Sequence, residues 1–371
     1  MGDDCARPSH LFAFLLHLLL LLLLRPPLTW AHSKCFLFNF GDSNSDTGAL
    51  MAGLGLYLGP PSGQQFFHKT TGRFCNGRLY IDFICQNLKI NLLSPYLESS
   101  GSDFRHGVNF AVSGASTEVS LWIPFSLSVQ AGQFAHFQNR TRELRPQGKG
   151  SMMSEKEFRN AVYSIDIGQN DINLALVANS TYQQVVDKIP AIISRIEIGV
   201  KLLYGSGARK FWMYNIGPIG CLPQTLALRK KVGMEVDELG CLALYNDAAK
   251  AFNKGLSDLS DKLGSQLNNA TVVYTDMYAI KYDLFANPGK YGFKKPLMAC
   301  CGTGGAPYNY VDKKTCGEPT ASACSDPSEA VSWDGVHYTE AANDVIASKI
   351  MSAKYSKPSM KLKSFCKDDI Y

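Results

Sequence analysis

A glycine, an acid and a serine come directly after an apolar run near the start of the chain. Residues 36–40 are apolar or aromatic apart from one asparagine, which predicts a strand buried on both faces. The run ends at Gly41, Asp42 and Ser43, and residues 47–52 predict the start of a helix. Ser43 is then expected at the carboxyl end of the strand, where open α/β sheets gather their reactive groups. The alternative is that Ser43 only caps the helix.

The same stretch carries oxygen ligands at every second position, so a calcium loop is a second hypothesis. Asp42, Asn44 and Asp46 match its first, third and fifth positions. The sixth position, which needs glycine, is Thr47, and the twelfth, which needs a bidentate carboxylate, is Gly53. We therefore expect no metal site and no cofactor, and we expect Asp42 to be buried and hydrogen-bonded to the backbone of the turn.

A second group of chemically capable residues lies near the C-terminus, in the segment SWDGVHYTEAAND. Asp334 and His337 are three positions apart, just before an expected helix with Thr339 as its N-cap. An aspartate so placed accepts a hydrogen bond from one imidazole nitrogen and leaves the other free to take a proton. Serine is a weak nucleophile at neutral pH and needs such a base. We therefore expect Ser43, His337 and Asp334 to form a catalytic triad.

Acyl transfer also requires donors for the oxyanion of the tetrahedral intermediate. Two further predicted strands end in SGAS and in GQND, which contain Gly114 and Asn170. The backbone N–H groups of Ser43 and Gly114 and the side-chain amide of Asn170 are the expected donors. Losing one such donor typically costs on the order of 3 kcal/mol of transition-state stabilisation. A glycine at position 114 also lets the backbone approach a substrate closely.

Apolar strand-like runs alternate with helical stretches along the chain. The expected strands are residues 36–40, 107–112, 161–168, 208–217 and 270–280. The expected long helices are residues 182–204, which carry a continuous apolar stripe, and residues 238–263. This order predicts the α/β class, a parallel sheet with helices on both faces. We see no internal repeat and no Pro/Gly/Ser linker, so we expect a single domain over residues 32–371.

Composition and the N-terminal tract indicate the setting. Hydrophobic residues make up 46% and charged residues 19% of the 371 residues, enough to bury a large core. The net charge of +5 comes without a long basic run, so nucleic acid is not an expected partner, and no obligate protein partner is inferred. The apolar tract at residues 11–24 is too short to span a bilayer and precedes a cleavage-like Thr-Trp-Ala. Residues 1–31 are thus predicted to be a signal peptide; two acids beside Arg7 leave an uncleaved anchor as the alternative.

Removal of residues 1–31 leaves ten cysteines, and this even number suits an oxidising compartment. No paired C-x-x-C units exist, so a structural zinc site is not expected. We favour local disulfides, such as Cys221 with Cys241 and pairings within residues 300–324, although connectivity does not follow from sequence. Glycosylation acceptor triplets, which agree with secretion, begin at Asn139, Asn179 and Asn269. We expect a glycosylated protein of the Golgi lumen or the cell wall.

Together these blocks resemble the plant-type GDSL esterase/lipase family, or SGNH hydrolases. The resemblance lies in the blocks that contain Ser43, Gly114, Asn170, and Asp334 with His337. The segment NIGPIGCLP resembles a further plant-type block, and GDSN stands where the family name has GDSL. The resemblance implies a flavodoxin-like three-layer α/β/α sandwich with a parallel five-stranded sheet, and a serine esterase. No G-x-S-x-G elbow occurs, which excludes the α/β-hydrolase arrangement of the nucleophile.

Two long segments, residues 60–78 and 300–317, are expected to border the site. Both mix aromatic side chains with Gly, Asn, Gln and basic residues, a mixture that suits sugar rings better than acyl tails; the alternative is that they are only solvated, disulfide-pinned loops. The first carries four basic side chains and no acid, which favours an acidic polysaccharide. Parts of both resemble family members that remove acetyl groups from cell-wall polysaccharides such as xylan. The hypothesis is an O-acetylesterase with a small acyl pocket; the alternatives are a lipid or small-metabolite acyl esterase and an inactive glycan-binding member.

Overall fold

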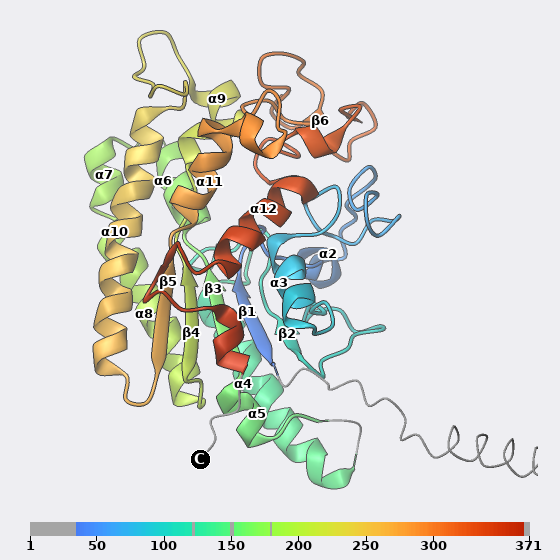
Figure 1. Cartoon of the computed structure of the whole chain (residues 1–371), viewed down its shortest axis with the longest axis vertical. Coiled ribbons are helices and arrows are strands. Elements are labelled where there is room, and N and C mark those ends of the chain that lie inside the picture. The colour runs from blue at the N-terminus through green and yellow to red at the C-terminus, as the bar shows by residue number, and fades with distance from the viewer. Residues whose placement is uncertain (1–34, 121–122, 149–151, 179, 367–371) are drawn as a thin grey trace, which may run out of the picture. The chain divides into compact units, whose positions relative to one another are not determined.

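The computed structural model of this chain describes residues 35–120, 123–148, 152–178 and 180–366 (Figure 1). The predicted signal peptide and Asn179 lie outside these residues. Within the described ranges, every helix is too short or too polar to cross a membrane.

A six-stranded sheet forms the centre of the fold, in the order β2-β1-β3-β4-β5-β8. The strands are β1 Leu37–Gly41, β2 Gly107–Asn109, β3 Val162–Asp166, β4 Lys210–Tyr214, β5 Thr271–Thr275 and β8 Ser356–Lys357. Strands β1 to β5 pair in parallel, and β8 joins β5 antiparallel at the edge. The predicted five-stranded parallel sheet is confirmed. The edge strand was not predicted, because two residues are too few to carry an alternation pattern.

Helices cover both faces of the sheet, as the two sides of Figure 1 show. The helices are α2 Ala49–Leu54, α3 Tyr80–Leu88, α4 Leu127–Leu144, α5 Glu155–Asn160, α6 Gln169–Val177, α7 Tyr182–Val186, α8 Ile189–Gly205, α9 Pro223–Arg229, α10 Ala243–Gln266, α11 Met277–Ala286 and α12 Glu340–Met351. On β1, Phe38 and Phe40 pack into the core beneath α4, α8 and α10, whereas Leu37 packs into the core beneath α3, α11 and α12. Both faces of the strand are therefore buried, which explains its unbroken apolar sequence. The three-layer α/β/α architecture is confirmed.

Several predicted boundaries were wrong, and two of the errors have a clear local cause. The strands expected over residues 107–112 and 208–217 are shorter, β2 Gly107–Asn109 and β4 Lys210–Tyr214. The helix expected over residues 182–204 is two helices, α7 and α8, because Pro190 cannot donate an amide hydrogen bond near the start of α8. The strand expected to run to residue 280 ends at Thr275, since Asp276 caps α11 by accepting a hydrogen bond from the amide of Ala279. The helix expected from residue 238 begins at Ala243.

Candidate active site

Ser43 lies on the turn between β1 and α2, at the carboxyl end of the parallel sheet, as the sequence predicted. Position 41, the last residue of the strand, needs glycine because a Cβ there would clash with the carbonyl oxygen of Asp166 on the neighbouring strand. The Ser43 residue is 8% exposed. The strand therefore delivers this serine to the edge of the sheet with little of it open to solvent.

The backbone of this turn is fixed by hydrogen bonds on both sides of Ser43. The amide of Asp42 donates to the Asp166 carbonyl at 3.2 Å, and that of Ser45 donates to the Asp42 carbonyl at 3.2 Å. The Asn44 amide donates to Oδ1 of Asp42 at 3.0 Å. Asp42 is thus buried and bonded to the turn, as expected. Among the hydrogen bonds of the described turn, none uses the amide of Ser43.

Asp46 joins this turn to the segment that contains Gly114. Its carboxylate accepts hydrogen bonds from the amides of Gly48, Ala49 and Leu50 at 2.7, 2.5 and 3.1 Å. It also accepts from the amide and the hydroxyl of Ser113 at 2.7 and 2.8 Å. The carboxylate of Asp46 is therefore bonded to backbone amides at a helix start.

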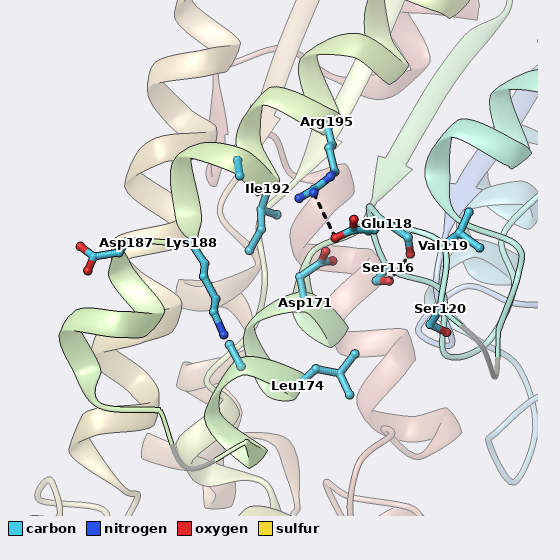
Figure 2. A pocket seen from close by; sticks show the side chains of 12 residues that line it. Ser116, Glu118, Val119, Ser120, Asp171, Leu174, Asp187, Lys188, Ile192 and Arg195 are labelled. Atoms are coloured by element: carbon cyan, nitrogen blue, oxygen red, sulfur yellow. Dashed lines mark hydrogen bonds and ion pairs between the residues drawn. The ribbon is translucent and has the colours of Figure 1, made fainter.

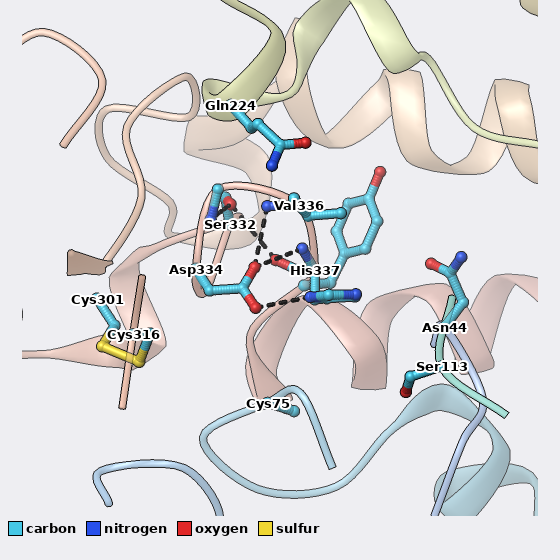
Figure 3. A network of polar contacts seen from close by, with 12 residues as sticks. Asn44, Cys75, Ser113, Gln224, Cys301, Cys316, Ser332, Asp334, Val336 and His337 are labelled. Atoms are coloured by element: carbon cyan, nitrogen blue, oxygen red, sulfur yellow. Dashed lines mark hydrogen bonds and ion pairs between the residues drawn. A yellow bond between two sulfur atoms is a disulfide. The ribbon is translucent and has the colours of Figure 1, made fainter. Parts of the chain in front are cut away.

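Asp334 and His337 contact each other directly in the turn before α12 (Figure 3). Nδ1 of His337 lies 2.6 Å from Oδ2 of Asp334, and Oδ1 of Asp334 accepts from the amides of Val336 and His337 at 2.9 and 2.8 Å. Burial alone would raise the pKa of Asp334, but the neighbouring imidazole and these amides hold that pKa below its usual range. The predicted N-cap is confirmed, since the Thr339 hydroxyl accepts from the amide of Ala342.

The second ring nitrogen of His337 remains available. Nε2 is buried and has no hydrogen-bond partner among the described residues. In Figure 3 the ring nitrogen farther from Asp334 points toward the side on which Asn44 and Ser113 lie. A buried nitrogen without a partner is costly unless a substrate or a reacting group completes it. The arrangement can take a proton from a hydroxyl placed at this nitrogen.

The two remaining predicted oxyanion donors come from adjacent segments that hold each other. Asn170, near the start of α6, donates through Nδ2 to the carbonyl of Ala115 at 2.8 Å. Gly114 adopts φ 79°, and a Cβ there would lie 2.9 Å from the side chain of Ile123. The amides of Ser113 and Ala115 donate to Asp46 and to a neighbouring carbonyl, and no described hydrogen bond uses the amide of Gly114. Asn170 therefore positions the Gly114 segment, which the sequence alone did not predict.

The described residues form four disulfides, and two of them lie in the loop that contacts the Asp334–His337 turn. The four are Cys35–Cys366, Cys221–Cys241, Cys300–Cys324 and Cys301–Cys316. The amides of Cys300 and Cys301 donate to the carbonyls of Ser332 and Trp333 at 2.9 and 2.6 Å. The local pairings were predicted, and the bridge between the two ends of the domain was not. These four bonds suit an oxidising compartment.

Two of the ten cysteines, Cys75 and Cys85, are buried free thiols. Burial raises the pKa of Cys75 to about 12 and raises that of Cys85 as well. The Sγ of Cys75 accepts a hydrogen bond from the amide of Gly77 at 3.3 Å. The even number of cysteines thus does not mean that all are paired, and these two thiols are expected to be unreactive in the folded protein.

Both predicted border segments contact the Asp334–His337 turn. The ring of Phe74 lies 5.0 Å from that of His337, centroid to centroid. Tyr310 packs against Gly335, where a Cβ would lie 2.5 Å from the tyrosine ring. Gln224 donates from Nε2 to the Tyr310 hydroxyl at 2.6 Å and from its amide to the Gly335 carbonyl at 3.0 Å. An aromatic ring and a side-chain amide therefore stand together beside the turn.

Two of the four basic side chains of the first border segment, Arg73 and Arg78, are paired with acids inside the protein. Arg73 is buried in an ion pair with Asp82 at 2.8 Å. Arg78 pairs with Glu340 at 2.6 Å, and its guanidinium lies over an aromatic ring on each side. Sequence could not reveal these acidic partners, because they lie on α3 and α12 rather than within the segment.

The two described glycosylation acceptors are both exposed. Asn139 lies on α4, where its Oδ1 accepts from Arg142. Asn269 lies in the turn before β5 with φ 56°. Either side chain is accessible to a modifying enzyme.

A cavity of about 570 Å³ lies beside residues 116–120, between α6 and α8 (Figure 2). An ion pair between Arg195 and Glu118, at 3.0 Å, crosses its upper part, and the exposed side chain of Leu174 borders it below. The hydroxyl and the amide of Thr117 donate to Asp171 on its wall. Neither the serine turn nor the histidine lines this cavity, so it does not enclose the candidate site.

The fold is a three-layer α/β/α sandwich, and the polar groups of the candidate site lie at the carboxyl edge of its parallel sheet. Residues 37–350 match the model of the GDSL-like lipase/acylhydrolase family, and the chain belongs to this family. It is therefore a carboxylic ester hydrolase by class.

Three curated relatives match over most of their length. The GDSL esterase/lipase LIP-4 of Arabidopsis thaliana is 49% identical, covering 94% of each chain. An esterase of Hevea brasiliensis is 40% identical, covering 91% of each chain, and alpha-L-fucosidase 3 of Arabidopsis thaliana is 42% identical, covering 87% of this chain and 92% of the relative.

Proposed function

We propose that Ser43 is the nucleophile of this esterase, His337 its general base and Asp334 the acid that orients the imidazole. The observation that carries the proposal is the state of His337. Its Nδ1 lies 2.6 Å from a carboxylate, while its Nε2 is buried without a partner. A nitrogen prepared in this way is what a serine hydroxyl needs in order to react at neutral pH.

The reaction then proceeds in two balanced halves. Oγ of Ser43 attacks the ester carbonyl carbon and gives its proton to Nε2 of His337. The carbon–oxygen bond to the alcohol then breaks, and the departing oxygen takes that proton from Nε2. The acyl group is left as an ester on Ser43. A water molecule next gives a proton to the same nitrogen and attacks the acyl carbon. The bond to Oγ breaks, Ser43 regains its proton, and the carboxylic acid leaves.

The oxyanion formed in each half is held by three donors from three segments. They are the amides of Ser43 and Gly114 and the side chain of Asn170. Asn170 uses one amide hydrogen to hold the Ala115 carbonyl at 2.8 Å, so its second hydrogen is the one assigned to the oxyanion. Preorganised donors of this kind stabilise charge without reorganising during the reaction.

Asp334 acts on the geometry of the base rather than on the substrate. Both of its oxygens are occupied, Oδ1 by two backbone amides and Oδ2 by the imidazole. The depressed pKa of Asp334 keeps it ionised, so it stabilises the imidazolium that forms when the serine is deprotonated.

We infer that the acyl group is acetyl and that the acyl acceptor is a glycan such as xylan. The serine is 8% exposed and the His337 side chain 12% exposed, which favours a small acyl group. The ring of Tyr310 with the amide of Gln224 beside it offers a stacking face and hydrogen bonds, which suit a sugar. One relative, alpha-L-fucosidase 3, is named for a sugar. Esterases of lipids or small metabolites, and an inactive glycan-binding protein, are the competing functions.

We further propose that the protein works in the secretory pathway, either in the Golgi lumen or in the cell wall. Support comes from four disulfides, from exposed acceptors at Asn139 and Asn269, and from the leader-like residues 1–31. Expression in a reducing cytosol is expected to give poorly folded material.

The substrate proposal is tested by acyl-chain length and by acetate release. We expect the rate on p-nitrophenyl esters to fall steeply from acetate to longer chains, and acetate to be released from acetylated xylan. Tyr310→Ala is expected to raise KM for the polysaccharide several-fold more than KM for p-nitrophenyl acetate; Tyr182→Ala, an exposed tyrosine on α7, is the matched control. A preference for octanoate, with no acetate released from any acetylated glycan, would favour a lipid esterase.

A further inference from the structure

A single buried ammonium group lies next to the turn that carries Ser43. Lys281, on α11, is 1% exposed. Its Nζ donates to Oδ1 of Asn44, the residue after Ser43, at 3.2 Å. Asn44 in turn donates from its amide and from Nδ2 to Oδ1 of Asp42, at 3.0 and 2.9 Å. The lysine therefore holds Asn44, which is itself bonded to Asp42, so the residues on both sides of Ser43 are linked to it.

The same ammonium group contacts the segment that carries the base. Nζ of Lys281 lies 4.9 Å from the centroid of the Tyr338 ring, a distance typical of cation–π contact. Tyr338 directly follows His337 in the chain and is buried. Lys281 is thus in contact with a residue adjacent to Ser43 on one side and a residue adjacent to His337 on the other.

The segment NIGPIGCLP makes room for this lysine. A Cβ at Gly217 would lie 2.7 Å from Cδ of Lys281, so a larger residue there would displace the lysine side chain. Asn215, in the same segment, accepts from the amide of Tyr278 at 2.9 Å. It also donates to Oδ1 of Asp276, the cap of α11, at 2.9 Å. The segment therefore fixes the start of the helix on which Lys281 lies.

Buried carboxyl groups surround the lysine. Asp42 on the turn and Asp166 on β3 are its charged neighbours, and Tyr80 of α3 donates to Asp166 at 2.9 Å. Burial lowers the pKa of Lys281, but these two carboxyls act against that effect. Isolated charges are unfavourable in a protein interior, so the lysine and the acids require one another.

We propose that Lys281 is a positioning residue of the esterase, which fixes the nucleophile turn relative to the base through Asn44 and Tyr338. The inference rests on the proposed roles of Ser43 and His337. It also assigns a purpose to the NIGPIGCLP segment, whose Gly217 leaves space for the lysine. Since a misplacement of about 1 Å can cost roughly 10²-fold in rate, loosening this contact is expected to slow the chemical step.

The main test compares Lys281→Met with the wild type on p-nitrophenyl acetate. Active sites are first counted with a fluorophosphonate probe, so that unfolded molecules do not enter the rate. We expect kcat per labelled site to fall roughly 10- to 100-fold, with KM changed less than about twofold, because positioning affects the transition state more than binding. An unchanged kcat per labelled site would overturn the inference and leave the proposed nucleophile intact. Failure of the wild type to label at Ser43 would instead overturn the proposed function.

Two further variants separate positioning from general stability. Lys349→Met is the matched control: Lys349 of α12 pairs with Asp283 at 2.6 Å and lies over two tyrosine rings. It is expected to lower Tm without lowering kcat per site. If Lys281→Met does not fold, Tyr338→Leu is used instead, because it removes the ring contact and leaves the buried charges unchanged. It is expected to reduce kcat several-fold. A wild-type kcat in Tyr338→Leu, or an equal fall in Lys349→Met, would overturn the proposal.

Discussion

The turn that carries Ser43 and the turn that carries His337 are held in place by different forces. The first is fixed by buried polar side chains: Gln130 accepts from the amide of Gly41 and donates to its carbonyl, at 2.9 and 2.8 Å. Asn109 donates to the carbonyl of Ser45 at 2.6 Å. The second is fixed by backbone hydrogen bonds from a loop that two disulfides cross-link.

This difference means that the two halves of the site respond to different perturbations. A hydrogen-bond network in the interior is stable when complete and costly when one member is lost. A disulfide acts mainly by restricting the unfolded chain and is sensitive to reductant. Polar substitutions should therefore affect the serine turn most, and reduction should affect the histidine turn most. The following predictions test this comparison.

Removing one reacting group from either turn is expected to have the same large effect. Ser43→Ala and His337→Ala should each lower kcat on an acetyl ester at least roughly 10³-fold, because the two act as a unit. Asp334→Asn should retain a small residual rate. Far-UV circular dichroism controls for folding, and more than a few per cent of wild-type rate in Ser43→Ala would refute the assignment.

Asp46→Ala should break the network of the serine turn. It leaves three helix-start amides and the Ser113 amide without their acceptor. We expect the free energy of unfolding to fall by on the order of 4 kcal/mol, because several buried donors lose their partner at once. Asp326→Ala, which removes an exposed acceptor from Ser328, is the control and should cost less than about 1 kcal/mol. Both free energies of unfolding are measured by urea denaturation. Equal losses in Asp46→Ala and Asp326→Ala would show that the network does not stabilise the turn.

Removing Cys301–Cys316 should loosen the histidine turn alone. A disulfide that closes a loop of 15 residues is expected to contribute about 3 kcal/mol to the free energy of unfolding, which Cys301→Ser/Cys316→Ser should lose. We also expect its kcat to fall several-fold when active sites are counted with a fluorophosphonate probe. The control is Cys35→Ser/Cys366→Ser, which opens a bridge at the start of β1. That variant should lose stability but keep its kcat. A retained kcat in the first double variant would contradict the supporting role of the loop.

Asp42→Asn should change how stability depends on pH. Burial, and secondly the nearby Asp166, raises the pKa of Asp42 to about 7 from 3.8. Its contribution to stability is therefore fully present below the unfolded pKa and is lost as pH rises through about 7. Asparagine keeps the acceptor for Asn44 and cannot ionise. Between pH 4 and 7 the variant should gain stability relative to the wild type, by roughly 3 kcal/mol. A difference that is constant with pH would contradict this.

Local patterns predicted much of the fold and of the site. The apolar run before Ser43 specified β1, and the spacing of Asp334 and His337 specified their contact, because each involves neighbours in sequence. The two-residue strand β8 and the break before α8 were missed. In both cases the deciding feature was a single proline or a pair of residues, too short for a periodicity to appear.

Contacts between distant segments were the part that sequence could not supply. Lys281 reaches Asn44 across 237 positions, and Arg78 reaches Glu340 across 262. Nothing in either residue's own neighbourhood indicates its partner. The charge of Arg78 was consequently expected to face a ligand, whereas it is neutralised within the protein. Polar contacts between distant segments are therefore the features that local sequence patterns predict least well.

The most direct test of the account is to find the residue that reacts with a fluorophosphonate. The folded, secreted protein is incubated with the probe, digested and mapped by mass spectrometry, alongside His337→Ala. We expect a single adduct on Ser43, at close to one per molecule, formed together with loss of esterase activity, and a labelling rate at least roughly 10²-fold lower in His337→Ala. An active protein that carries no adduct on Ser43, or one that reacts equally fast without His337, would contradict the central claim.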